Sequence, residues 1–284
     1  MISYFASHYT IIMVMIGTFL VGATAAGIGV FAVLRRQSLL GDAISHAALP
    51  GIALMFMYSM STNPFVLLFG GGIAGCIGAF LVLLITRTTT LKQDALLGII
   101  LSVFFGFGVV LKTVIQKKGL ANQALLGKFF FGNASTLSSF DIFAIAVMAF
   151  FIFCIIFLFW KEFFLISFDP EFAHANGYRV FILEVVLTIT TVFAIVIGLH
   201  TVGVLLMSAL LIAPAAAARQ WVSSVSALFW LAIFFGSLAC VAGSLISSYV
   251  EHLPTGPTIV VCMSLIVIVT FMFAPVRTTG RGEL

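Results

Sequence analysis

Nine long apolar runs occupy most of this sequence of 284 residues, and they constrain its fold more than any other feature. A helix that crosses a bilayer needs roughly 20 apolar residues. The runs therefore predict an all-α, polytopic transmembrane bundle of eight to ten spans, with nine as the best count. Pro50 and Pro214 interrupt two short runs, either of which could form a broken or half-buried helix. The runs cover residues 10–33, 41–58, 64–86, 95–115, 139–160, 180–198, 202–218, 223–248 and 257–274.

The composition excludes a water-soluble globule. Hydrophobic residues make up 62% of the chain and charged residues only 8%, whereas a soluble domain carries about 25% charged residues. The net charge of +4 is too small and too scattered to indicate nucleic-acid binding. The first residues lack the basic flank of a cleavable signal peptide, so we expect the first run to be retained as a helix. The four cysteines lie inside apolar runs and are interpreted as small buried residues: Cys76, Cys154, Cys240 and Cys262.

The lysines and arginines predict an orientation, because they are enriched in cytoplasmic loops. Nine alternating spans with a cytoplasmic C-terminus put nine of them inside and four outside. The N-terminus is then outside, residues 116–138 form the longest outer connection, and residues 161–179 form the longest cytoplasmic one. The inner set is Arg35, Arg36, Arg87, Lys92, Lys161, Arg179, Arg219, Arg277 and Arg281, and the outer set is Lys112, Lys117, Lys118 and Lys128.

Asp42 and His46 are ionisable residues inside the second run, where a charge usually marks a substrate path or a partner. They are four residues apart, so both side chains lie on one face of a helix. A carboxylate oxygen and an imidazole nitrogen on one face can bind a divalent cation. A hydrogen-bonded pair that only stabilises the bundle would show the same spacing, so the residues alone leave both interpretations open.

Other polar residues have more local explanations. Glu184 follows Arg179 closely, which predicts a local ion pair between them. His200, Glu251 and His252 fall on the predicted outer side, where they could help cations to enter or could simply be interfacial residues. His8 lies near the outer N-terminus and has the same two interpretations. Two ligands do not complete a metal shell, so the other groups would come from elsewhere in the chain, from water or from a second copy.

Four segments carry a resemblance to a known family. Residues 34–51 (LRRQSLLGDAISHAALPG) closely resemble the signature of bacterial ABC-type metal-ion permeases, the membrane subunits of zinc, manganese and iron importers. Residues 202–219 resemble the late-helix motif of that family, and residues 253–260 resemble the start of its last helix. Residues 168–177 (FDPEFAHANG) are similar to its cytoplasmic loop that contacts the ATPase. The resemblance extends from about residue 10 to residue 275.

The resemblance implies a type II-like ABC importer permease in the bacterial plasma (inner) membrane, with residues 1–284 as one transmembrane permease domain. It implies a homodimer surrounded by membrane lipid, a cytoplasmic ATPase that binds ATP under each protomer, and an extracellular or periplasmic protein that delivers the metal. The permease itself would be no enzyme and would hold no permanent cofactor. The chain indeed lacks a Gly-x-x-x-x-Gly-Lys-[Ser/Thr] phosphate loop.

The cytoplasmic connection at residues 161–179 is the expected ATPase-coupling loop. Asp169 before Pro170 is typical of a helix N-cap and first helical residue, with Glu171 in the first turn. Gly177 suits the end of that short helix. We therefore assign the coupling role to Asp169, Pro170, Glu171, Ala173 and Gly177; the alternative is an amphipathic loop resting on the membrane, although the segment lacks a basic face.

Two other functional classes fit the sequence less well. A proton-coupled secondary metal transporter usually needs more intramembrane carboxylates than this chain has. An intramembrane protease would need His-Glu-x-x-His or paired membrane aspartates, and the sequence has no such motif and only Asp42 clearly embedded. The transported ion is expected to be Mn²⁺, because the segment at residues 34–51 looks closer to manganese-type permeases, with Zn²⁺ as the next candidate.

Overall fold

The computed structural model describes residues 2–60, 63–117, 132, 137–250 and 253–274. Over these residues the chain forms helices and no strand, as predicted. The helices are α1 (Ile2–Leu34), α2 (Leu40–Ser59), α3 (Pro64–Thr88), α4 (Gln93–Lys117), α6 (Ser139–Leu158), α7 (Trp160–Phe168), α8 (Pro170–Ala175), α9 (Val180–Thr201), α10 (Val204–Ala218), α11 (Val225–Tyr249) and α12 (Thr255–Phe273).

Eight helices are long and apolar enough to cross a membrane: α1 (from Tyr9), α2, α3, α4, α6, α9, α11 and α12. The chain is therefore a multi-pass membrane protein. Of the two runs that contain a proline, the first forms the continuous 20-residue α2 around Pro50. The second forms α10, whose 15 residues span about 22 Å at 1.5 Å per residue, less than the roughly 30 Å hydrocarbon core. Gly203, at φ 92°, turns the chain just before α10 and so shortens the predicted seventh span.

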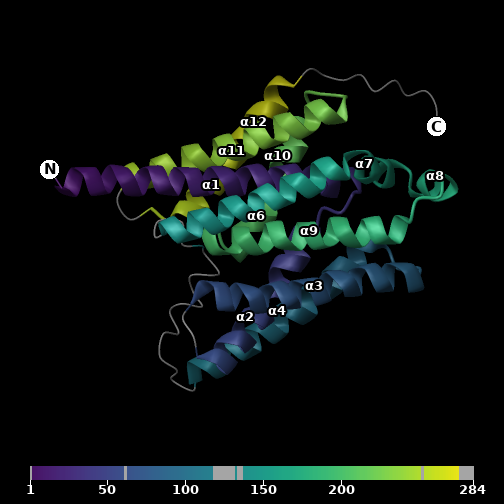
Figure 1. The fold of residues 1–284 in the computed structure, drawn as a ribbon, viewed down its shortest axis with the longest axis horizontal. Coiled ribbons are helices and arrows are strands. Elements are labelled where there is room, and N and C mark those ends of the chain that lie inside the picture. The colour runs from purple at the N-terminus through teal and green to yellow at the C-terminus, as the bar shows by residue number, and fades with distance from the viewer. Residues whose placement is uncertain (1, 61–62, 118–131, 133–136, 251–252, 275–284) are drawn as a thin grey trace.

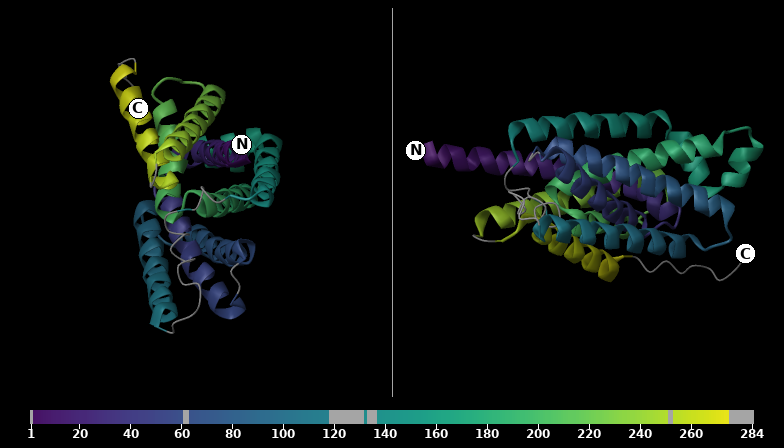
Figure 2. Two further views of the ribbon diagram at one scale, coloured as in Figure 1. Left: turned by 90° about the vertical axis from the view of Figure 1, so that its left-hand side faces the viewer. Right: turned by 90° about the horizontal axis from the view of Figure 1, so that it is seen from below.

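The helices form two groups along a common axis (Figure 1). Helix α2 packs against α3 and α4 in one group, while α1, α6, α10, α11 and α12 form the other. Helices α9 and α10 connect the groups, because α9 contacts α3 and α10 contacts α2. The N-terminus and α8 lie at opposite ends of the long axis, and the left-hand view of Figure 2 shows the same separation of the groups.

Helix α2 is the most deeply buried of the eight candidate spans. Its small residues let neighbouring backbones approach closely, as expected where lipid offers no hydrophobic drive for helix association. A Cβ built on Gly51 would overlap the carbonyl oxygen of Gly70 in α3, and a Cβ on Gly70 would lie 2.6 Å from the carbonyl oxygen of Gly51. Helix α2 is therefore fixed by backbone-to-backbone packing.

Three of the predicted cytoplasmic arginines lie close together. Arg35 and Arg87 both contact Glu184, and Arg87 and Arg179 line one groove beside α8. These contacts place the ends of α1 and α3 and the start of α9 at the same end of the bundle. Most of the predicted outer connection at residues 116–138 lies outside the described residues, as do Lys118, Lys128, Arg277 and Arg281.

Candidate metal site and coupling segment

Asp42 and His46 lie one turn apart at the start of α2. The Nε2 atom of His46 is 3.6 Å from Oδ1 of Asp42, and the side chains are 10% and 34% exposed, respectively. This distance is too long for a hydrogen bond. Two ligand atoms about 2.1 Å from one metal ion are about 3–3.5 Å apart. The geometry therefore fits two ligands of one cation better than a directly hydrogen-bonded pair.

The pair lies midway along the neighbouring helices. The ring of His46 meets the edge of Phe105 with centroids 4.9 Å apart and planes at 78°, and Phe105 is at the centre of α4. Ile44, between the two ligands, contacts the position of Gly75 near the centre of α3. A long spanning helix has its centre near the bilayer midplane, so Asp42 and His46 lie at about that depth.

The described residues leave this site incomplete. They contain no group of three or more His, Cys, Asp or Glu side chains that could hold a metal. The buried Nδ1 of His46 and the buried hydroxyl of Ser45 have no hydrogen-bond partner. Pro50 has no N–H, so it cannot donate the usual helical hydrogen bond to the carbonyl oxygen of His46. Polar atoms are thus available beside the pair, but the part of the chain that the structure describes supplies only two charged or imidazole ligands to it.

Of the predicted outer residues, the structure describes His200, which does not join the pair. His200 lies half-buried in the last turn of α9 and interacts electrostatically with Asp141 in the first turn of α6. Asp141 is itself held in a capping box with Ser138. Glu251 and His252 lie outside the described residues, so their role stays a prediction, as does that of His8, whose side chain is not described.

The short helix α8 forms as its local sequence predicts. The Asp169 side chain accepts a hydrogen bond of 2.8 Å from the N–H of Phe172, and Pro170 is the first helical residue. At the other end Gly177, at φ 82°, donates to the carbonyl of His174 while Tyr178 donates to that of Ala173. This pair of bonds is a Schellman motif. The helix is therefore closed at both ends by its own residues.

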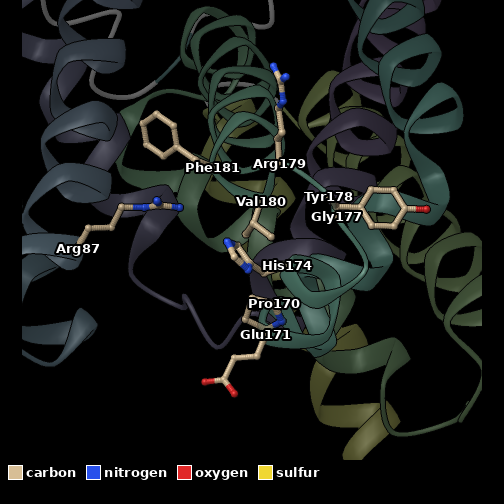
Figure 3. Close-up of a pocket in the computed structure, with 9 residues that line it drawn as sticks. All are labelled: Arg87, Pro170, Glu171, His174, Gly177, Tyr178, Arg179, Val180 and Phe181. Atoms are coloured by element: carbon tan, nitrogen blue, oxygen red, sulfur yellow. The ribbon is translucent and has the colours of Figure 1, made fainter.

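An open groove of about 660 Å³ runs beside α8. Figure 3 shows Arg87 reaching across from α3 toward the start of α9, with His174 and Glu171 on α8. Ala173 is fully buried and anchors α8, whereas Glu171 is exposed. The groove and α8 thus form one accessible surface at the end of the bundle opposite the N-terminus (Figure 1). Its lining residues are Arg87, Pro170, Glu171, His174, Gly177, Tyr178, Arg179, Val180 and Phe181.

The expected pairing of Glu184 with Arg179 is wrong. The Glu184 carboxylate accepts hydrogen bonds from Arg35 at 2.6 Å and from Arg87 at 2.7 Å. Residues five apart on a helix point in directions about 140° apart, so Arg179 faces elsewhere and lines the groove. Burial lowers the pKa of the Arg35 guanidinium, and the charge of Glu184 opposes that change. No local pattern could predict this pairing, because Glu184, Arg35 and Arg87 come from three separate segments.

Comparison with known proteins identifies the family of this chain. Residues 7–274 match the model of the ABC 3 transport family. The chain belongs to this family. It is 44% identical over 271 residues to the zinc transport system membrane protein TroC of Treponema pallidum, covering 95% of this chain and 91% of that protein. It is 41% identical over 265 residues to the manganese transport system membrane protein MntC of Bacillus subtilis, covering 93% and 61%, respectively.

A solved structure in the same family has the same fold. The complex of PsaBC from Streptococcus pneumoniae with Fab contains a chain that matches with a TM-score of 0.82 and 30% identity, over 97% of each chain. The family resemblance carried by the four sequence segments is therefore confirmed.

Proposed function

We propose that this chain is the membrane permease subunit of an ATP-binding-cassette importer for Mn²⁺ or Zn²⁺. The observation that carries the proposal is the Asp42–His46 pair, which offers an oxygen and a nitrogen to a cation at the middle of the bundle. Family membership supports the same function. The permease binds and passes the ion, and it performs no chemistry on it.

The names of the relatives limit the candidate ions to zinc and manganese. TroC is named for zinc, whereas the MntC proteins of Bacillus subtilis and Listeria monocytogenes are named for manganese. An oxygen-and-nitrogen site accepts either ion, and most such sites prefer zinc over manganese by intrinsic affinity. We propose manganese as the physiological cargo and zinc as its competitor, with selectivity arising from geometry and from the delivering protein.

A second copy of the permease is proposed to complete the site. One chain supplies one carboxylate and one imidazole, while zinc takes four ligands and manganese often takes more. A homodimer with a two-fold axis would supply each ligand twice. The 34% exposure of the Asp42 side chain in the single chain supports this arrangement, because a metal ligand shared across an interface must be accessible from its own subunit.

The energy source is proposed to be a separate cytoplasmic ATPase that docks on α8. The segment at residues 169–177 offers a capped and exposed helix, anchored by Ala173 and bordered by the groove. An extracellular or periplasmic protein would deliver the ion to the opposite end, where His200, Glu251 and His252 are candidate contacts. Replacing Glu171 and Gly177 with bulky basic residues should then weaken co-purification of the ATPase. Crosslinks from the ATPase only to other loops would contradict the docking assignment.

The proton-coupled alternative is not favoured. Such a transporter needs intramembrane carboxylates that can gain and lose protons. Glu184, a carboxylate in a spanning helix, has each of its oxygens bound by an arginine, so it is already engaged in a structural contact. Uptake that persists without the ATPase and collapses with the proton gradient would reverse this conclusion.

Uptake of radioactive manganese by cells that lack their own manganese importers tests the proposed function. Cells carrying the whole transporter should accumulate the ion, and Asp42→Ala or His46→Ala should abolish uptake while the protein remains in the membrane. Unlabelled manganese should compete better than unlabelled zinc. Normal uptake by both variants would contradict the metal assignment, and stronger competition by zinc would make zinc the cargo.

A further inference from the structure

The Glu184 carboxylate joins three segments that are far apart in the sequence. Its Oε1 atom contacts Arg35, just after α1, and its Oε2 atom contacts Arg87, near the end of α3. Glu184 itself is one turn inside α9. The Glu184 and Arg35 side chains are only 15% and 12% exposed. A buried ion pair of this kind holds its segments in one register, because separating them leaves a charge unpaired away from water.

Arg35 is close in the chain to α2, the helix that holds Asp42 and His46 (the metal-site helix). Helix α1 ends in a second Schellman motif, in which Arg36, at φ 57°, donates to Val33 and Gln37 donates to Ala32. The N–H of Leu40, the first residue of α2, then donates to the carbonyl of Gln37 at 3.1 Å. The connection between α1 and α2 is thus short and bonded throughout. A displacement of Arg35 must therefore move the start of α2, where Asp42 lies.

Glu184 is tied just as closely to α8. Only residues 176–179 separate α8 from α9, and Gly177 and Tyr178 in that connection form the C-cap of α8. Arg87 reaches the same surface from the other side. Its guanidinium lies 4.4 Å from the ring centroid of Phe181, and both residues line the groove beside α8. The carboxylate therefore stands between the proposed ATPase surface and the metal-site helix.

We propose that Glu184 is a positioning residue that transmits movement of α8 to α2 through Arg35, so that ATP hydrolysis on the partner drives metal movement at Asp42. This role rests on the proposed function, because it needs an ATPase on α8 and an ion at Asp42. Arg87 is 45% exposed and its contact can exchange with water, whereas the Arg35 contact is buried. The Arg35 contact is thus expected to persist during movement, whereas the Arg87 contact can break and re-form.

The test measures two rates on one preparation: ATP hydrolysis and manganese uptake by the whole transporter in liposomes, with its ATPase and metal-delivery protein. In Glu184→Gln the carboxamide keeps the shape but loses the charge that both arginines need. We expect ATPase co-purification and hydrolysis within twofold of wild type, with at least a tenfold fall in ions moved per ATP hydrolysed. A merely structural role would lower both rates in proportion to the folded protein and leave their ratio unchanged.

Asp94→Asn is the matched control, because Asp94 is exposed in the first turn of α4, outside the metal pair, the coupling loop and the groove, and should leave the ratio unchanged. If Glu184→Gln does not fold, Arg87→Gln tests the inference instead, because the exposed Arg87 side chain can be lost without unfolding the protein. The Arg87→Gln variant should lower the number of ions moved per ATP two- to fivefold. An unchanged ratio in the folded variant overturns the inference. If Asp42→Ala abolishes transport but Glu184→Gln leaves it intact, only this inference is overturned. If the wild-type transporter moves no manganese, the proposed function is overturned.

Discussion

Asp42 and Glu184 are both carboxylates near the start of a spanning helix, yet the structure gives them opposite surroundings. Asp42, in α2, has His46 as its ionisable neighbour and a side chain that is 34% exposed. Glu184, in α9, has one arginine on each carboxylate oxygen and is 15% exposed. The two acids therefore differ in their partners, although each lies in the first two turns of its helix.

This difference gives the two acids different roles. With neutral histidine, Asp42 and His46 carry a net charge of −1, so a divalent cation is attracted to them. Glu184 with its two arginines carries a net charge of +1, so it repels a cation and has no vacant oxygen to offer. The same functional group is therefore a metal ligand in one helix and a structural tie in the other. The first two predictions test this difference directly, and the last two test the helices that hold the two sites.

The largest effect is expected at the metal pair. Asp42→Asn keeps the size of the side chain but removes the charge that attracts the ion, and it should lower manganese uptake by more than about 100-fold, beyond the 10–100-fold typical of outer-shell partners of metal ligands. Ser45→Ala is the neighbouring control, because the buried Ser45 hydroxyl has no partner to lose. Uptake assays should place Ser45→Ala within twofold of wild type; equal losses in both variants would show a general packing defect.

The next effect separates the two arginines of Glu184. Removing the buried Arg35 leaves the carboxylate half-paired away from water and should destabilise the protein by about 3 kcal/mol. Removing the exposed Arg87 should cost less than about 1 kcal/mol. Thermal unfolding of Arg35→Gln and Arg87→Gln in the same detergent compares them. Equal shifts in the melting temperature would mean that burial does not distinguish the two contacts.

A smaller effect is expected where α2 meets α3. Gly70→Ala places a Cβ 2.6 Å from the carbonyl oxygen of Gly51, so the helices must separate, at a cost of about 1–3 kcal/mol. Gly72→Ala, two residues away, meets no atom within 4 Å and should change stability by less than about 1 kcal/mol. Thermal unfolding measures both variants. A Gly72→Ala variant as unstable as Gly70→Ala would contradict the close approach at this position.

The smallest effect is expected at the α8 cap. Asp169→Ala removes the side-chain acceptor for Phe172 and should cost about 1 kcal/mol of local helix stability. Binding of the ATPase to the purified permease should weaken by roughly tenfold or less, since about 1.4 kcal/mol corresponds to tenfold. Asp169→Asn restores an equally good cap and should bind like wild type. Weak binding by both variants would mean that the charge, and not the cap, contacts the ATPase.

Local features were predictable from the sequence, and tertiary ones were not. The i,i+4 spacing placed Asp42 and His46 on one face, and the cap residues at Asp169 and Gly177 fixed both ends of α8, because each depends only on neighbours within a few residues. The partners of Glu184 were missed because Arg35 and Arg87 reach it through helix packing. The seventh run, predicted at residues 202–218, forms the short helix α10 from Val204, because an apolar run does not reveal the turn at Gly203.

The most direct test of the account is paramagnetic resonance of Mn²⁺ bound to the purified permease. The spectrum should show nitrogen hyperfine coupling from a histidine, which should disappear in His46→Ala, and the bound metal should approach one ion per two chains. Coupling that survives in His46→Ala would contradict the site. Two ions per two chains, lost one at a time in dimers with a single His46→Ala subunit, would show that each chain completes its own site.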